Sequence, residues 1–286
     1  MNKNINFELN IPGIMPFVEV LRLKSSTADI SIVIIACSIL QQIDFRAGLL
    51  LLSSVMIHSG GDIINDIYDR RIDRICKPNS PIVSGRMSVT TAWAFVSILY
   101  SVSIVIAASL NYICVILSIL GIFIGGILYS HPKFRLKDHP ILSITGLAVC
   151  FALVPAAVWS IYAPVTIDTL MVSLYAFMLI FSLAFFKDFK DVKGDINSLP
   201  LMLGVKKAAI VVSALSLFPL LPMLYLLWLY KTTAIALAII IYLPIAISAV
   251  HILTNDPVTN GHTLKDRMLM MIFIPSLVIF STTFFL

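Results

Sequence analysis

Long apolar segments along the whole chain constrain the fold more than any other feature of this sequence. Runs such as Ala234 to Leu243 are apolar on every side, whereas a strand of a membrane barrel alternates apolar and polar residues over about ten positions. A spanning helix needs about 20 predominantly apolar residues. Charge clusters and Pro, Gly or Asn residues divide the chain into nine such segments. We expect helices at 27–45, 47–68, 89–109, 112–130, 141–161, 167–187, 207–229, 232–253 and 267–286.

The scarcity of charge supports the same class of protein. Only 12% of the 286 residues are charged, against about 25% in a water-soluble domain. We therefore expect one all-α, multi-pass membrane domain over residues 1–286, surrounded by lipid and without a nucleic acid partner. The N-terminal region contains Glu8 and Glu19 and has no compact apolar core, so no removable signal peptide is expected. The four cysteines show neither a disulfide pattern nor zinc-ligand spacing.

The charges sort by side when the loops between nine spans alternate across the membrane. On that scheme 18 of the 20 Lys and Arg residues share the side of the N-terminus, and only Arg46 and Lys231 lie opposite. The positive-inside rule then places the N-terminus in the cytoplasm. Thirteen of the 15 acids fall on the same side, leaving only Asp44 and Asp168 on the outer side. An anionic ligand held through metal ions would bring both signs of charge to one face.

Three aspartates follow the second expected span at helical spacing. Asp66, Asp69 and Asp73 stand at i, i+3 and i+7, which places them on one face of a helix. The alternative is a solvated helix end in which the acids pair with Arg70 or Arg74.

The sixth expected span ends on a second stripe of the same design. Asp188, Asp191 and Asp195 repeat the i, i+3, i+7 spacing, four spans further along the chain. Both stripes therefore end on the same side of the membrane, and this duplication disfavours a merely solvated helix end.

Paired carboxylate stripes suit hard divalent cations, which take oxygen ligands and keep substrate phosphates in their coordination shell. Six carboxylates could hold Mg²⁺ ions that bridge a diphosphate and neutralise the charge that develops as it leaves. The apolar walls beneath would suit a hydrocarbon tail. The residues thus favour an enzyme that acts on a lipid diphosphate at the cytoplasmic face.

At this point the motifs resemble those of the UbiA superfamily of intramembrane prenyltransferases. Asn65-Asp66-x-x-Asp69-x-x-x-Asp73 is similar to the first signature of that family, and Asp188-x-x-Asp191-x-x-x-Asp195 is similar to the second. The stretch from Tyr129 to Lys137 resembles its YxxxK element and the YSxPxxRLK form of its homogentisate and chlorophyll branches.

The resemblance implies a nine-helix bundle around a central cavity, with the motifs on cytoplasmic caps, and Mg²⁺-dependent transfer of an isoprenyl group from a polyprenyl diphosphate. It implies a catalytic part for Asp66, Asp191, Lys133 and Tyr129. Its metal ligands would be the six stripe residues Asp66, Asp69, Asp73, Asp188, Asp191 and Asp195. Its substrate contacts would include Asn65, Tyr129, Lys133 and, before the first span, Arg22, while Lys77 and Lys187 are further cations for the departing diphosphate.

Two departures from the family pattern bear on the acceptor. Ser80 stands where many members have arginine, and the loop after Asp195 reaches Pro200 about four residues early. Homogentisate-type members also lack that arginine, which favours an aromatic or quinone-precursor acceptor. The sequence around Asp66 and Asp69 equally resembles that of archaeal-type enzymes that alkylate a glycerol phosphate lipid.

Other functions stay open on the sequence alone. A terpene cyclase of the same family would keep both aspartate stripes. A transporter would carry its acids near the middle of the membrane or along a path, whereas these acids end spans at one face. We interpret His58 and His251 as hydrogen-bonded packing residues, and Asp62 as a helix-end charge outside the metal site.

Overall fold

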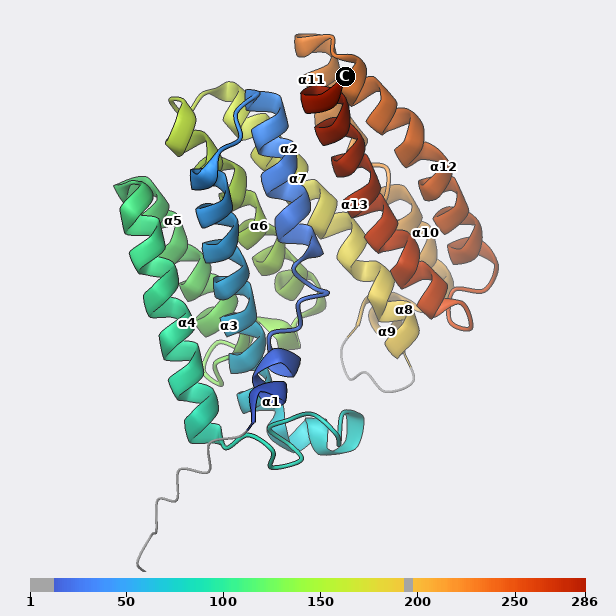
Figure 1. Cartoon of the computed structure of the whole chain (residues 1–286). Coiled ribbons are helices and arrows are strands. Elements are labelled where there is room, and N and C mark those ends of the chain that lie inside the picture. Colours follow the sequence, from blue (N-terminus) through green and yellow to red (C-terminus); the bar gives the residue numbers. More distant parts are fainter. Residues whose placement is uncertain (1–12, 193–197) are drawn as a thin grey trace, which may run out of the picture.

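The protein is an all-helical bundle in the computed structural model, which describes residues 13–192 and 198–286 (Figure 1). Those residues contain helices and turns and no strand. Seven helical segments among them are long and apolar enough to cross a membrane. The all-α, multi-pass class expected from the apolar segments is therefore confirmed.

The described residues form sixteen helical elements. In chain order the elements are α1 (Ile14–Val20), α2 (Thr27–Leu40), α3 (Phe45–Cys76), α4 (Val89–Leu110), α5 (Tyr112–Gly121), the π-helical η1 (Ile122–Leu128), the short η2 (Leu136–Asp138), α6 (Pro140–Tyr162), α7 (Ile167–Leu183), η3 (Ala184–Lys187), α8 (Asp188–Asp191), α9 (Leu199–Leu203), α10 (Val205–Leu215), α11 (Leu220–Tyr230), α12 (Thr233–Asn255) and α13 (Gly261–Phe285).

Two expected spans correspond to helices below the usual spanning length. The first is the 14-residue α2, and the other is the apolar helix Tyr112–Leu128, which combines α5 with η1. The count of nine spans therefore stays a prediction. The second expected span is longer than predicted, because α3 continues to Cys76 and carries the first aspartate stripe on unbroken helix.

The seventh expected span, 207–229, is interrupted by a turn between α10 and α11. Pro219 and Pro222 lie at this break, and a proline removes a helical hydrogen-bond donor and clashes with the preceding turn. The buried Tyr242 of α12 donates a hydrogen bond of 2.6 Å to the Ser216 carbonyl. That contact satisfies a backbone acceptor which the interrupted helix leaves free.

Close approach of backbones fixes the position of η1 beside α3. A Cβ atom added to Gly61 would lie 3.3 Å from the Gly125 carbonyl oxygen, and one added to Gly60 would lie 2.2 Å from the Tyr100 ring. The approach at Gly61 is tighter than a Cβ atom usually makes, and at Gly60 the Tyr100 ring of α4 would have to shift. The packing of η1 against α3 positions Tyr129, the residue that follows η1.

Segments far apart in the sequence meet at one end of the bundle. Figure 1 shows α1, α8 and α9 at the lower end, with the C-terminus at the opposite end. Asp44 marks the connection from α2 to α3, where it accepts hydrogen bonds from Arg46 and Tyr162. The end that holds α1 and α8 carries the first aspartate stripe and the start of the second, at Asp188.

Candidate active site

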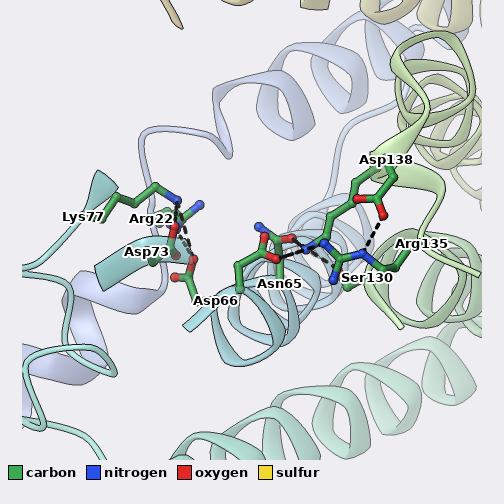
Figure 2. Close-up of polar contacts among 10 residues, drawn as sticks. Arg22, Asn65, Asp66, Asp73, Lys77, Ser130, Arg135 and Asp138 are labelled. Carbon is green, nitrogen blue, oxygen red and sulfur yellow. Dashed lines mark hydrogen bonds and ion pairs between the residues drawn. The ribbon is translucent and has the colours of Figure 1, made fainter. Parts of the chain in front are cut away.

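The first aspartate stripe is bound by cations that come from outside its own helix. Arg22, in the connection between α1 and α2, donates a hydrogen bond to the Asp66 carboxylate. The Lys77 ammonium lies 3.4 Å from Asp73 and 4.0 Å from Asp66. Both carboxylates are nearly buried, with 4% and 5% of the residue exposed, so their charge depends on these partners. Figure 2 shows Arg22, Asp66, Asp73 and Lys77 as one group.

Asp69 turns towards a second group of cations. The Lys137 ammonium lies 2.5 Å from its Oδ1 atom, and the Arg135 guanidinium lies 3.7 Å from the same atom. Lys137 also donates a hydrogen bond of 2.8 Å to the Asn65 side chain. Burial lowers the pKa of Lys137 below its ordinary value, although Asp69 acts in the opposite direction. Figure 2 shows Asn65, Ser130 and Arg135 in this second group.

Backbone strain accompanies both arginines that reach the stripe. Arg22 has a φ of 46° and Arg135 a φ of 38°, and neither is glycine. The left-handed region costs an ordinary residue of the order of 1–3 kcal/mol and persists only where the surroundings enforce it. Gln41 and Lys231, which end α2 and α11 away from the stripe, have similar φ values of 53° and 51°, so a positive φ by itself does not mark the site.

The contacts of the first stripe disfavour the alternative of a solvated helix end, and they include one lysine that the sequence expectation did not name as a site residue. Among the described residues, its carboxylates pair with Arg22, Lys77, Arg135 and Lys137 rather than with Arg70 or Arg74. The Tyr129 to Lys137 stretch supplies Lys137 to the aspartates, whereas the Lys133 side chain is exposed. Lys137 lies in the quoted motif, but spacing alone did not distinguish it from Lys133, because the chain turns sharply at Arg135. The role of Lys133 stays a prediction.

The second stripe begins at α8, at the same end of the bundle (Figure 1). The backbone N–H of Leu199 donates to the Asp188 carboxylate at 3.5 Å, so this aspartate holds the chain that returns from the loop. Asp191 ends α8, but its side chain lies outside the described part of the chain, and Asp195 lies entirely outside it. The expected metal-binding role of these residues stays a prediction.

A large cavity of about 810 Å³ opens beside the first stripe. Of the predicted substrate contacts, Arg22, Asn65, Tyr129 and Lys187 line it. Its deeper walls are mainly aliphatic and aromatic side chains of α2, α3, α5, α6 and α13, among them Leu50, Phe151 and Ile272. A cavity with a charged mouth and apolar walls suits a molecule with an anionic head and a hydrocarbon chain.

A smaller polar cleft of about 540 Å³ adjoins the same charges. Asp66, Lys77 and Ser80 line it, together with Arg22, which also lines the large cavity. Arg22 therefore lies where the two spaces meet. Ser80 contributes only a hydroxyl to the cleft, at the position where the family pattern often has arginine.

The first stripe also offers oxygen atoms of the kind that Mg²⁺ prefers. The Oδ2 atom of Asp73 is buried and accepts no hydrogen bond from the described residues. Asp66 and Asp73 both lie within 4.0 Å of one ammonium group, so a cation at this point meets two carboxylates. Within the described part of the chain, no three candidate ligands converge to hold a metal ion. A bound Mg²⁺ would therefore need further oxygens, and substrate phosphates commonly supply them.

The structure also places a polar pair where the sequence suggested only packing. Asp29 of α2 and His58 of α3 both line the large cavity, and the two side chains lie 2.7 Å apart. His58 is hydrogen-bonded, as expected, but it faces the cavity. No motif or spacing in the sequence connects these two residues.

Fold and site together define a polytopic helical membrane protein in which an apolar cavity opens beside an end of the bundle that is rich in aspartates and cations. Residues 31–274 match the model of the UbiA prenyltransferase family. The chain therefore belongs to this family, and the resemblance drawn from the aspartate motifs is confirmed.

Curated relatives include proteins with two kinds of acceptor in their names. A probable chloroplastic homogentisate phytyltransferase 2 from Oryza sativa is 35% identical over 171 residues, covering 53% of this chain and 43% of that protein. A digeranylgeranylglyceryl phosphate synthase from Sulfurisphaera tokodaii is 32% identical over 157 residues, covering 54% and 53%. The chain thus spans about half the length of these two relatives. The synthase of Methanothermobacter thermautotrophicus is 27% identical over 250 residues, covering 82% and 81%.

Solved structures share the fold at lower sequence identity. A digeranylgeranylglyceryl phosphate synthase superposes with a TM-score of 0.73 and 22% identity, covering 96% of this chain and 99% of that one. A UbiA homologue from Archaeoglobus fulgidus, bound to GPP and Mg²⁺, superposes with a TM-score of 0.67 and 22% identity, covering 93% and 99%. This likeness shows the helical architecture.

Proposed function

We propose that the protein transfers an isoprenyl group from a polyprenyl diphosphate to a lipophilic acceptor, with Mg²⁺ as cofactor and diphosphate as the second product. The observation that carries the proposal is that Arg22, the partner of Asp66, and Asn65 line the apolar cavity, so that the cavity opens beside the first stripe. Such a site can bind an anionic head group at its charged end and a hydrocarbon tail in its apolar cavity. Membership of the family supports the same reaction.

In this proposal the two aspartate stripes hold the metal-bound diphosphate between them. Asp66, Asp69 and Asp73 would contribute ligands from one stripe, and Asp188, Asp191 and Asp195 from the other. When bound, Mg²⁺ would supply positive charge that neutralises the diphosphate as it departs. The A. fulgidus homologue, whose structure contains GPP and Mg²⁺, supports this cofactor.

The chain's own cations would stabilise the same departing charge. Arg22, Lys77 and Lys137 already surround the first stripe, and Lys187 lines the cavity. Fixed positive groups placed where negative charge develops lower the barrier to ionisation of the allylic C–O bond. The apolar walls exclude water, so that the acceptor rather than a water molecule captures the allylic cation. Tyr129 lines this space, and its ring face could stabilise the cation.

The first candidate acceptor is an aromatic or quinone precursor. Ser80 in place of the usual arginine and the Tyr129 to Lys137 stretch favour it. The relative named homogentisate phytyltransferase supports it as well.

A glycerol phosphate lipid is the second candidate acceptor. Lys24 and Lys265 line the cavity in addition to the cations around the aspartates, and they could bind a second phosphate. Relatives named digeranylgeranylglyceryl phosphate synthase support this acceptor.

The orientation belongs to the same proposal. The sorting of basic residues favours nine spans, with the N-terminus and the aspartate stripes on the cytoplasmic side. The seven long helices and the two shorter apolar helices are compatible with that count.

The test is a matrix of donors and acceptors. Purified protein with Mg²⁺ is incubated with C10, C15 and C20 diphosphates and with homogentisate or geranylgeranylglyceryl phosphate, and mass spectrometry identifies the products. We expect a prenylated acceptor together with free diphosphate. A hydrocarbon product formed from the diphosphate alone would identify a cyclase instead. Absence of diphosphate release from every donor would contradict both reactions, and solute flux in proteoliposomes would then test transport.

A further inference from the structure

Three polar side chains line the cavity deeper in the bundle than the aspartate stripe. The Nδ1 atom of His58 lies 2.7 Å from one carboxylate oxygen of Asp29. The Ser54 hydroxyl donates a hydrogen bond of 2.6 Å to the other oxygen. All three residues line the cavity. Both oxygens of this buried carboxylate are therefore satisfied, and Asp29 is held in one orientation.

The two partners differ in what they present to the cavity. The side chain of Asp29 is 3% exposed, whereas that of His58 is 21% exposed. Because the carboxylate accepts at Nδ1, that nitrogen carries a proton, and Nε2 is left to meet a ligand. Among the described residues, none forms a hydrogen bond with Nε2. The Phe151 ring lies edge-on to the imidazole at 5.4 Å and limits its rotation.

The position of His58 along α3 places Nε2 deeper in the bundle than the expected diphosphate site. His58 precedes Asp66 by eight residues on one continuous helix, which corresponds to about 12 Å along the axis. The diphosphate head and the first carbon of the prenyl chain would occupy the part of that distance nearest Asp66. An acceptor bound at Nε2 would then extend across the rest of that distance towards the reacting carbon.

A purely structural explanation accounts for less of this arrangement. A hydrogen-bonded pair between α2 and α3 could fasten the two helices together, but burial of a carboxylate and an imidazole is costly in an apolar setting. The partly exposed ring and its orientation by Asp29 are features of a binding site, because a mere fastening does not require a nitrogen that faces the cavity.

We infer that the Asp29 and His58 pair binds the acceptor: Nε2 of His58 forms a hydrogen bond with the acceptor's hydroxyl group, and Asp29 is the positioning residue that orients the ring. A hydroxyl can donate or accept a hydrogen bond, so phenols and glycerol lipids share this chemistry. The inference rests on the proposed function, since it concerns the second substrate of that reaction. It explains how an otherwise apolar cavity could hold a polar acceptor in one orientation.

The experiment separates the acceptor from the donor. The variants are His58→Phe, which keeps a ring without the nitrogen; His58→Gln, whose amide nitrogen can replace Nε2; and Asp29→Asn. The matched control is His251→Phe, an exposed histidine of α12 that contacts Asn255 outside the cavity. Donor affinity is measured with geranylgeranyl diphosphate and Mg²⁺. Transfer is measured with homogentisate or geranylgeranylglyceryl phosphate, whichever the wild type prenylates.

We expect kcat/KM for the acceptor to fall by about tenfold or more in His58→Phe, the effect of losing a hydrogen bond in a closed site. Donor affinity should stay at the wild-type value, His58→Gln should recover most of the loss, and Asp29→Asn should raise the acceptor KM without weakening donor binding. His251→Phe should match the wild type throughout.

Three results would overturn the inference: an unchanged kcat/KM for the acceptor in His58→Phe, an equal loss of donor affinity and transfer, or a His58→Gln variant as impaired as His58→Phe. If His58→Phe fails to fold, His58→Gln and Asp29→Asn decide the question through the same split between acceptor and donor. A wild-type protein that releases no diphosphate from any donor would contradict the proposed function itself, which is a separate outcome.

Discussion

Arg22 contacts the carboxylate of Asp66 across 44 positions of sequence. The arginine precedes α2, and the aspartate lies far along α3. Because Asp66 is nearly buried, loss of Arg22 would leave a buried carboxylate without its partner, which costs more than the loss of an exposed ion pair. The contact joins the N-terminal segment to the first aspartate stripe, at the boundary of the cavity and the polar cleft.

Replacement of that arginine should impair use of the diphosphate donor. We expect Arg22→Gln to lower kcat/KM for the donor by about tenfold or more, because charged hydrogen bonds contribute more than neutral ones. The control is Arg46→Gln, which removes an arginine paired with Asp44 outside the cavity. Steady-state kinetics check the difference, and equal rates in both variants would contradict a role for Arg22 at the site.

The aspartates themselves should govern turnover. Asp66→Asn and Asp191→Asn should each lower kcat by about 100-fold or more, since each removes a proposed ligand of the Mg²⁺ that would neutralise the departing diphosphate. Asp256→Asn serves as the control, because Asp256 is an exposed loop residue bonded to the Thr259 backbone. Retention of wild-type turnover in both site variants would remove these residues from the mechanism. Thermal unfolding in detergent verifies that the variants fold.

Divalent metal should be required for transfer and for donor binding. Excess EDTA should abolish diphosphate release, and Mg²⁺ should restore it, because carboxylate oxygens such as the buried Oδ2 of Asp73, unpaired among the described residues, match the ligand preference of that ion. Donor binding measured with and without Mg²⁺ provides a readout that does not depend on turnover. Full turnover in EDTA would refute the metal assignment.

A comparison of two lysines distinguishes the sequence expectation from the structure. Lys137 contacts both Asp69 and Asn65, whereas Lys133 is exposed. We expect Lys137→Ala to lower kcat/KM for the donor by about tenfold or more, the effect of a lost charged hydrogen bond, and Lys133→Ala to have a smaller effect. Kinetics of the two variants side by side make the test. The reverse order would contradict this assignment and favour Lys133, the lysine expected from the sequence.

The orientation can be tested by chemical labelling. In a background without the native cysteines, Asn79→Cys lies next to the first stripe and Lys231→Cys lies at the opposite end of the bundle. We expect a membrane-impermeant thiol reagent to label only Lys231→Cys in intact cells, as the sorting of basic residues predicts. Labelling of Asn79→Cys alone would show that the orientation is inverted.

The sequence by itself determined the class of protein and the residues of the two stripes. Hydropathy and i, i+3, i+7 spacing are local properties that a helix converts directly into spans and faces. For the same reason the motif from Tyr129 to Lys137 could be recognised without its contacts. The break at Ser216 to Pro219 was harder to foresee, because prolines are also tolerated inside α6, α12 and α13 of this chain.

Only the tertiary structure decided which charges meet. Arg22 reaches Asp66, Lys137 rather than Lys133 reaches Asp69, and Asp29 reaches His58 inside the cavity. These partners belong to separate segments, whose approach depends on helix packing, on glycine contacts such as that of Gly61 with Gly125, and on the strained turn at Arg135. Local spacing carries no information about such distances, so the folded arrangement alone assigned each carboxylate its partner.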